Sequence, residues 1–298
     1  MMNDHDACII LNMLNGLGGI SAWKNHGAYI NALIEACGSV SAVFEADAAF
    51  LSRIEGVDEE HADRICHWRE FVDLESERKA AKDHGAAILC RTDDEYPESL
   101  RGLENPPLCL YIRGKLPDRL DIRSVAIVGT RTPSDRGIRM ARSFAESAVR
   151  HGWSTVSGLA LGIDTAAHRA TLDAGGKTVA APGSGLANVF PAENIELAHD
   201  IVRAGGAVVS EYPMNTCATR CTLPRRNRII AALSRCTLVV EACKSSGALI
   251  TAKEARKLGL RIFAVPGTDG DPLAEGTNQL IRQGEKAVMD FADILDES

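Results

Sequence analysis

The sequence predicts an α/β protein in which a doubly wound, mostly parallel sheet follows a small all-helical region. Three observations support this fold class. Residues 124–181 repeat one unit, an apolar strand that ends in a glycine turn and leads into a helix. At least six strand–helix alternations occur in the chain, as expected for parallel strands joined by crossover helices. Residues 7–75 have instead the pattern of short helices separated by glycine turns.

The stretch from residue 124 to residue 181 organises the predicted sheet. The run Val125–Val128 is wholly apolar, as in a strand covered on both faces, and it ends at Gly129. A polar turn then leads into a helical pattern that continues to about Arg150. Ligands of such sheets bind beyond the carboxyl ends of the strands, where helix N-termini offer free N–H groups to an anion. The other elements predicted here are a strand over 154–157, a helix over 162–174 and a strand over 178–181.

The C-terminal part continues the alternation, with one irregular loop over residues 214–223. This loop ends in Pro224-Arg225-Arg226-Asn227-Arg228, which precedes a predicted helix through Leu233. The other elements expected here are a helix over 191–204, strands over 207–210, 237–241 and 261–265, helices over 249–258 and 276–283, and a final strand over 287–289.

The N-terminal region carries two glycine turns between helical segments, at residues 14–20 and 54–57. Each resembles the helix-hairpin-helix of small SAM-like domains, in which N–H groups at a glycine hairpin meet a DNA phosphate. Four acidic residues crowd the second turn and would repel a phosphate, so a packing or partner role is favoured over DNA contact; they are Glu55, Asp58, Glu59 and Glu60. A charged amphipathic helix over 71–83 and short strands over 86–90 and 109–113 lead into the sheet.

The charge of the chain permits a local basic groove but not a basic protein. The formal net charge is −7 at pH 7. Residues 1–120 hold 12 Lys and Arg against 21 Asp and Glu, whereas residues 121–298 hold 21 against 19. Arg220, Arg225, Arg226 and Arg228 fall within nine residues that contain no acidic residue. The C-terminal part therefore has the charge for a local basic groove, although the net charge of the whole chain is not that of a typical nucleic-acid-binding protein.

The cysteines predict neither a disulfide framework nor a metal site. The nine cysteines are scattered, and none forms the short-spaced pair of a zinc ribbon. A ligand set of Cys217, Cys221, Cys236 and Cys243 is a disfavoured alternative to reduced, partly buried thiols. The chain has no run of 18 apolar residues and no basic signal-peptide start, so we expect a cytoplasmic protein with no membrane partner.

The glycine turns do not match the fingerprint of a cofactor site. The chain lacks a GxGxxG turn after the first strand of the unit and lacks a GxxxxGK[ST] run, so we expect no nicotinamide, flavin or ATP cofactor. Arg131 lies beside the hydroxyls of Thr130, Thr132 and Ser134 at a predicted helix N-terminus, a set that suits a phosphate outside a dinucleotide. The plainer alternative is that Gly129 relieves a tight turn and Arg131 is solvated.

Several segments together resemble one known family. In chain order they are VAIVGTR, SGLALGIDTAAH, GGKTVAAPGSG, SEYP, LPRRNRIIAALS, VVEACKSSGALITA, and VPG followed by GTNQLI. They are similar to motifs of the DNA-processing protein A (DprA/Smf) family, over roughly residues 85–290. The resemblance implies an extended Rossmann-like domain that binds single-stranded DNA, forms homodimers and helps load the RecA recombinase during natural transformation.

The resemblance also implies a domain organisation. We expect a helical SAM-like domain over residues 1–75 and an extended Rossmann-like, DNA-binding domain over residues 76–298. Many family members end with a small winged-helix domain, which we expect this chain to lack. The apolar positions of 249–258 and 280–281 fit a dimer interface and ordinary core packing equally well.

The predicted DNA-binding residues are small or cationic, and most follow a strand or begin a helix. Small residues let a sugar–phosphate backbone approach closely, and arginines supply charge and forked hydrogen bonds without reading sequence. Arg131 and the run Arg225–Arg228 match family motifs, and Lys177 lies where family members often carry a basic residue. The full set is Gly129, Thr130, Arg131, Ser157, Gly158, Lys177, Gly183, Gly185, Arg225, Arg226, Asn227, Arg228, Ser246 and Gly247.

Two positions depart from the family motifs. Leu161 replaces the arginine of SGLARGID, which removes one cation. Leu223 replaces the phenylalanine often found before Pro-Arg-Arg, which removes a surface on which a base would stack.

A catalytic role is disfavoured. Asp164 and His168 lie four residues apart on one predicted helix, and Glu241 lies close to two serines, but no nucleophile with a paired base follows from these spacings. Asp164 serves equally well as a helix N-cap. The alternative function is a nucleotide or N-glycosidic-bond hydrolase with a Rossmann-like phosphate site, whose PGGxGT turn is matched only in part at residues 182–185.

Overall fold

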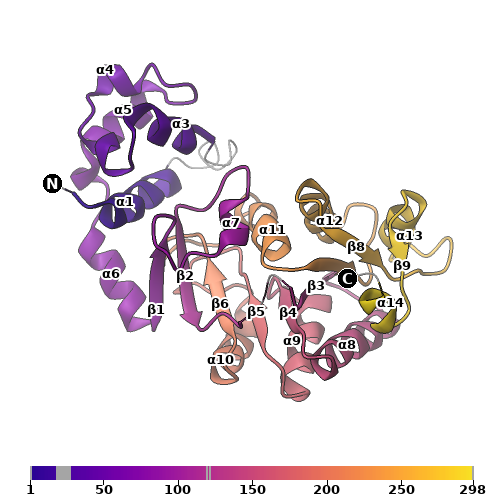
Figure 1. Cartoon of the computed structure of the whole chain (residues 1–298). Coiled ribbons are helices and arrows are strands. Elements are labelled where there is room, and N and C mark those ends of the chain that lie inside the picture. The colour runs from indigo at the N-terminus through magenta and orange to yellow at the C-terminus, as the bar shows by residue number, and fades with distance from the viewer. Residues whose placement is uncertain (1, 18–27, 119, 121, 297–298) are drawn as a thin grey trace. The chain divides into compact units, whose positions relative to one another are not determined.

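The computed structural model describes residues 2–17, 28–118, 120 and 122–296 (Figure 1). The chain folds into two compact units. The first unit comprises Met1–Ile112, Ser184–Asn188 and Ser210–Arg225, and the second comprises Arg113–Gly183, Val189–Val209 and Arg226–Ser298. The domain boundary expected after residue 75 falls inside the first unit.

The second unit is built on a parallel sheet, as predicted. Its strands lie in the order β6-β5-β4-β3-β7-β8-β9, and each adjacent pair is parallel. From β3 the chain runs outward through β4 and β5 to β6, then returns to β7 on the other side of β3. The sheet is therefore doubly wound, with a topological switch point between β3 and β7. The strands are β3 (Ser124–Val128), β4 (Ser154–Ser157), β5 (Thr178–Ala180), β6 (Ala207–Ser210), β7 (Cys236–Val239), β8 (Arg261–Ala264) and β9 (Lys286–Ala287).

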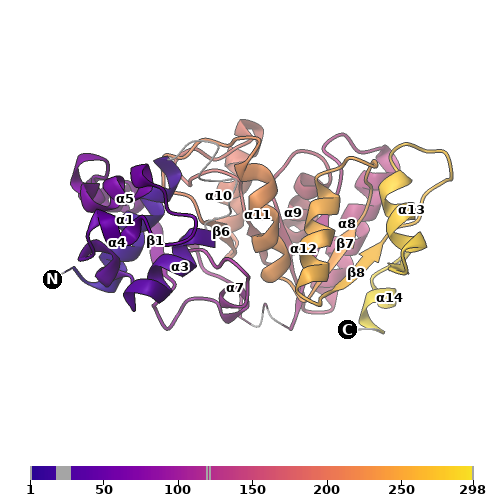
Figure 2. The same ribbon diagram turned by 90° about the horizontal axis from the view of Figure 1, so that it is seen from above.

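Helices cover both faces of this sheet, which explains why its strands are apolar throughout. Helices α8 (Asp135–Arg150) and α9 (Ile163–Asp173) lie on one face, and α11 (Thr222–Ala232) and α12 (Ala248–Lys257) lie on the other (Figure 2). Helix α8 packs through Ala141, Phe144, Ala145 and Ala148, whose spacing forms one stripe of the helix. The remaining elements of the unit are η3 (Ala192–Asn194), α10 (Ile195–Arg203), α13 (Glu275–Arg282) and α14 (Ala292–Leu295).

Helix α11 begins earlier than the sequence analysis expected. The helix was expected after Arg228, whereas it starts at Thr222, so the arginine run lies inside its first two turns. Pro224 is compatible with this start because N–H groups of a first turn have no partner within the helix. The arginines consequently project from different sides of a helix rather than from one loop, and Arg225, Arg226 and Arg228 are all buried.

The first unit contains the predicted short helices and two strands. Its elements are α1 (Asp4–Leu17), α3 (Ala28–Cys37), η1 (Ser41–Phe44), α4 (Ala48–Leu51), α5 (Glu59–Cys66), η2 (Trp68–Glu70), α6 (Leu74–Asp83), β1 (Ala86–Cys90), α7 (Glu98–Arg101) and β2 (Cys109–Gly114), of which the last two residues of β2 belong to the second unit. Asp47, Asp58 and Asp73 cap α4, α5 and α6 by accepting an N–H from the first turn. The acidic residues at the second glycine turn therefore include a helix cap.

The prediction of a glycine turn over residues 14–20 is wrong for residues 14–17. These residues continue α1, which ends at Leu17. Residues 18–20, the rest of this turn, lie outside the described residues. At the second turn Gly56 adopts a φ of +85°, and a Cβ there would lie 3.0 Å from the Tyr29 Cβ. That turn is consistent with the packing role favoured from the sequence.

A buried polar cluster joins α9 to the sheet. The hydroxyl of Thr155 lies 2.7 Å from those of Thr171 and Thr178, and Nδ1 of His168 lies 2.7 Å from the Thr178 hydroxyl. Burial, with a smaller effect of the Arg226 charge, lowers the pKa of His168 to about 3. His168 is thus a neutral core residue, consistent with the sequence analysis, which disfavoured a catalytic role for it.

We expect the buried His168 to make the protein acid-sensitive. The unfolded chain takes up a proton on this ring near the ordinary pKa of 6.5, whereas the folded chain does so near 3, so stability falls as the pH is lowered through that window. The slope contributed is at most about 1.4 kcal/mol per pH unit. Urea unfolding between neutral and mildly acidic pH should show this slope in the wild type and a shallower one in His168→Gln. Equal slopes in the wild type and in His168→Gln would contradict a lowered pKa of His168 in the folded protein.

Candidate nucleic-acid interface

Two exposed cations flank the topological switch point of the second unit. Arg131 lies on the loop that follows β3, and Lys244 lies on the loop that follows β7. These strands are neighbours, with Val128 paired to Val239, so both loops leave the carboxyl edge of the sheet side by side. Ligands of doubly wound sheets bind at this place. Lys244 was not in the predicted set, although its position just before the predicted Ser246-Gly247 turn could have indicated it.

The loop after β3 is held rigidly by the protein's own backbone. The N–H of Thr130 donates to the carbonyl of Glu241 at 2.7 Å. A Cβ at Gly129 would lie 2.5 Å from Cγ1 of Ile163 and 2.9 Å from the Glu241 carbonyl oxygen, so only glycine fits there. Thr130 is buried, whereas the side chain of Arg131 is exposed. A fixed loop therefore presents Arg131 to solvent.

The N-terminus of α8 is occupied by a carboxylate of the same chain. The Ser134 N–H donates to Oε2 of Glu241 at 2.8 Å, and the Ser134 hydroxyl donates to Oε1 at 2.6 Å. A Cβ at Gly137 would collide with this carboxylate. The sequence hypothesis that Ser134 and the helix N-terminus hold a phosphate is therefore wrong, because the buried Glu241 already supplies the negative charge there.

Asp164 likewise serves the backbone. Its carboxylate accepts the N–H groups of Gly158 at 3.0 Å and Ala160 at 3.3 Å. The N-cap of α9 is Gly162, so the interpretation of Asp164 as N-cap is wrong. Burial raises the pKa of Asp164, and the Arg226 charge and the two N–H groups oppose that rise. Asp164 thus shapes the loop that follows β4.

Arg226 ties the ends of two strands together. Its guanidinium is buried and donates to the carbonyls of Gly158, after β4, and Ala181, after β5. A Cβ at Gly158 would lie 2.6 Å from the guanidinium carbon, so the glycine makes room for the arginine. Gly158 and Arg226, both predicted to contact DNA, thus contact each other inside the protein.

Further predicted residues join the same edge through α11 and α12. Nδ2 of Asn227 donates to the Gly247 carbonyl at 3.1 Å, and the Ser246 hydroxyl accepts the Ala248 N–H at 3.3 Å. Gly247 is exposed and Ser246 half-buried, so this turn is accessible next to Lys244.

The remaining predicted residues of the second unit are buried or lie elsewhere. The Ser157 hydroxyl donates to the Ile127 carbonyl at 2.7 Å, and Gly183 and Arg228 are buried. Lys177 directly precedes β5, at the amino edge of the sheet, so the structure does not group it with Arg131 and Lys244.

Two predicted residues belong to the first unit. Nη2 of Arg225 lies 3.3 Å from Oε2 of Glu211, and both side chains are buried. The Gly185 N–H donates to the Thr216 carbonyl at 2.9 Å, and a Cβ at Gly185 would collide with the carbonyls of Pro213 and Met214.

Comparison with known proteins identifies relatives along most of the chain. A family model described as DNA recombination-mediator protein A matches residues 87–298. The protein Smf of Synechocystis sp. is 36% identical over 248 residues, which are 82% of this chain. The chain spans 62% of the length of that relative. Within the described residues, every helix is too short or too polar to cross a membrane.

Two solved structures share the fold. The X-ray structure of DNA processing protein A from Streptococcus pneumoniae is similar with a TM-score of 0.81 at 31% identity, and covers 100% of this chain and 99% of its own. A structure of DNA processing protein A from Helicobacter pylori, described for its single-stranded DNA binding mode, has a TM-score of 0.63 at 26% identity. The match covers 71% of this chain and 94% of that chain. The family match over 87–298 contains the switch point and both cationic loops, and the chain belongs to the DNA recombination-mediator protein A family.

Proposed function

We propose that this protein binds single-stranded DNA without sequence preference and acts as a recombination mediator that loads RecA on incoming DNA in natural transformation. The observation that carries the proposal is the pair of exposed cations, Arg131 and Lys244, at the switch point of the sheet. The DNA-binding mode described for the Helicobacter pylori relative supports it. A homodimer and a direct contact with RecA are part of the proposal and rest on the family.

The chemistry of this edge suits a phosphate backbone rather than a base. Arg131 and Lys244 offer charge and hydrogen-bond donors that accept a phosphate in any sequence context. The exposed Gly247 allows a strand to approach the turn beside Lys244 closely. The buried arginines would keep the edge rigid, because Arg226 holds the ends of β4 and β5.

We propose a role without catalysis. The carboxylates of Asp164 and Glu241, the acidic candidates for a catalytic role in the sequence, accept backbone N–H groups. A loading assay tests the mediator role. RecA filaments should form faster on single-stranded DNA covered by single-strand-binding protein when this protein is added, and should not do so with a variant that lacks Arg131 and Lys244. Equal rates with and without the protein would contradict the mediator role.

Leu223→Phe is expected to tighten binding of oligo-dT. Leu223 is half-buried at the start of α11, where the family often has phenylalanine. A ring on which a base can stack contributes about 1–3 kcal/mol, so the Kd should fall by at least about five-fold. Fluorescence anisotropy measures the change, and Leu223→Met, which adds volume without a ring, is the matched control. If the phenylalanine variant bound no more tightly than the methionine variant, base stacking at this position would be refuted.

A further inference from the structure

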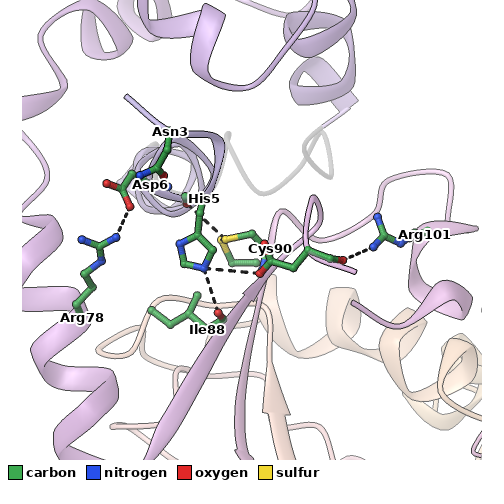
Figure 3. A network of polar contacts seen from close by, with 9 residues as sticks. Asn3, His5, Asp6, Arg78, Ile88, Cys90 and Arg101 are labelled. Atoms are coloured by element: carbon green, nitrogen blue, oxygen red, sulfur yellow. Dashed lines mark hydrogen bonds and ion pairs between the residues drawn. The ribbon is translucent and has the colours of Figure 1, made fainter. Parts of the chain in front are cut away.

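Three metal-ligating side chains meet in the first unit, far in sequence from the proposed DNA site. His5 projects from α1 toward the end of β1, where Cys90 lies, and Asp93 follows three residues later (Figure 3). Their ligand atoms all lie within 4.8 Å of one another. Among the described residues, these three side chains form a group of ligands that could hold a metal ion. No metal site was expected from the sequence, because its cysteines lack the short spacing of a zinc ribbon.

The geometry is close to that of a small coordination sphere. Nε2 of His5 lies 3.7 Å from Oδ2 of Asp93. Ligand atoms about 2.0–2.3 Å from a tetrahedral zinc ion lie about 3.3–3.8 Å from one another. The His5–Asp93 pair already has this separation, so small side-chain movements would complete the set.

The surrounding contacts hold the ligands in place. Oδ2 of Asp93 accepts the Cys90 N–H at 2.8 Å, which fixes the carboxylate beside the thiol. Arg101 donates to the carbonyls of Arg91 and Asp93 and so braces the turn after β1. Such supporting hydrogen bonds orient metal ligands and raise affinity.

The three ligands differ in burial, and two of them are accessible from solvent. Cys90 is fully buried, whereas the side chains of His5 and Asp93 are 40% and 23% exposed. The Cys109 sulfur lies 3.8 Å from the Cys90 sulfur on the buried side. An ion would therefore be held by three protein ligands and reached from solvent, with water in the fourth position.

We propose that His5, Cys90 and Asp93 bind one divalent cation of borderline softness, with Zn²⁺ as the best fit. A mixed nitrogen, sulfur and oxygen set disfavours Mg²⁺ and Ca²⁺, which take oxygen ligands, and suits zinc or cobalt. The competing explanation is an ordinary ion pair between His5 and Asp93, with Asp93 also holding the turn. The ion pair does not involve Cys90, so a metal bound through the Cys90 thiolate distinguishes the metal site from the ion pair.

Titration of the reduced full-length protein with Co²⁺ alone tests the site. A thiolate-to-cobalt charge-transfer band should appear, saturate at one equivalent and disappear when Zn²⁺ is added. The band should be absent in Cys90→Ser, and His5→Gln and Asp93→Asn should each weaken cobalt binding at least about ten-fold, as expected for loss of one ligand. Cys217→Ser is the matched control, because Cys217 is exposed in the same unit and outside the group.

Absence of the band in the wild type, or its persistence in Cys90→Ser, would overturn the proposal. Loss of the band in Cys217→Ser with retention in His5→Gln and Asp93→Asn would do the same. If Cys90→Ser fails to fold, the cobalt affinities of His5→Gln and Asp93→Asn decide between the two explanations, because these side chains are partly exposed. Circular dichroism checks that each variant is folded.

Discussion

Arg226→Ala is expected to lower the melting temperature of the protein by roughly 10 °C, because it leaves two buried carbonyls without their donor, at a cost of about 1–3 kcal/mol each. The guanidinium donates to the carbonyls of Gly158 and Ala181, and its charge offsets the burial of Asp164. Without it, two strand-end carbonyls lose their donor and the carboxylate of Asp164 loses a nearby cation. Differential scanning calorimetry at neutral pH measures the effect.

The control for this prediction is Arg131→Ala. Arg131 is exposed on a loop fixed by other contacts, so its loss should change the melting temperature by less than about 2 °C. The two arginines were predicted from the sequence to act alike on DNA, and the structure separates them by burial. A wild-type melting temperature in Arg226→Ala would contradict the role given to its guanidinium.

The double variant Arg131→Ala/Lys244→Ala is expected to bind oligo-dT about 100-fold more weakly than the wild type, because each charge-assisted contact with a phosphate is worth about 1.5 kcal/mol or more. The dependence of log Kd on log salt should also become shallower by about 1.4, since each phosphate contact on a single strand accounts for about 0.7. Fluorescence anisotropy at several salt concentrations gives both quantities.

A charge-matched control separates a local site from the overall field of the protein. Arg150 and Arg235 are exposed at the amino edge of the sheet, where they precede β4 and β7. Arg150→Ala/Arg235→Ala removes the same charge but should keep affinity within about three-fold of the wild type, because exposed charges beyond a Debye length are largely screened. An equal loss in both double variants would contradict a site at the switch point.

The strands and most helices of the second unit were predictable because parallel strands buried on both faces leave unbroken apolar runs. Val125–Val128 is such a run, and it pairs with β4 and β7 as a central strand. The start of α11 was not predictable from local pattern. Pro224 and a cluster of arginines indicate a loop or helix start, and only tertiary contacts such as that of Arg226 with the Gly158 carbonyl draw them into the fold.

The candidate site was predicted by position more than by role. The sequence placed Gly129, Arg131 and Gly158 correctly after their strands, since glycine turns mark strand ends. It could not reveal that Glu241, more than 100 residues from Ser134, fills the N-terminus of α8. The proximity of His5 to Cys90 could not be predicted from the sequence either, because no spacing rule relates residues from different elements.

The most direct test of a single-stranded DNA-binding function is the salt dependence of oligo-dT binding by the wild-type protein, with a mononucleotide as comparison. The Kd for oligo-dT should rise roughly ten-fold or more between about 50 mM and about 200 mM salt, as expected for several phosphate contacts. The mononucleotide should be bound far more weakly than oligo-dT and should not be hydrolysed. Salt-independent binding of oligo-dT, or turnover of the mononucleotide, would contradict a single-stranded DNA-binding function at the edge that carries Arg131 and Lys244.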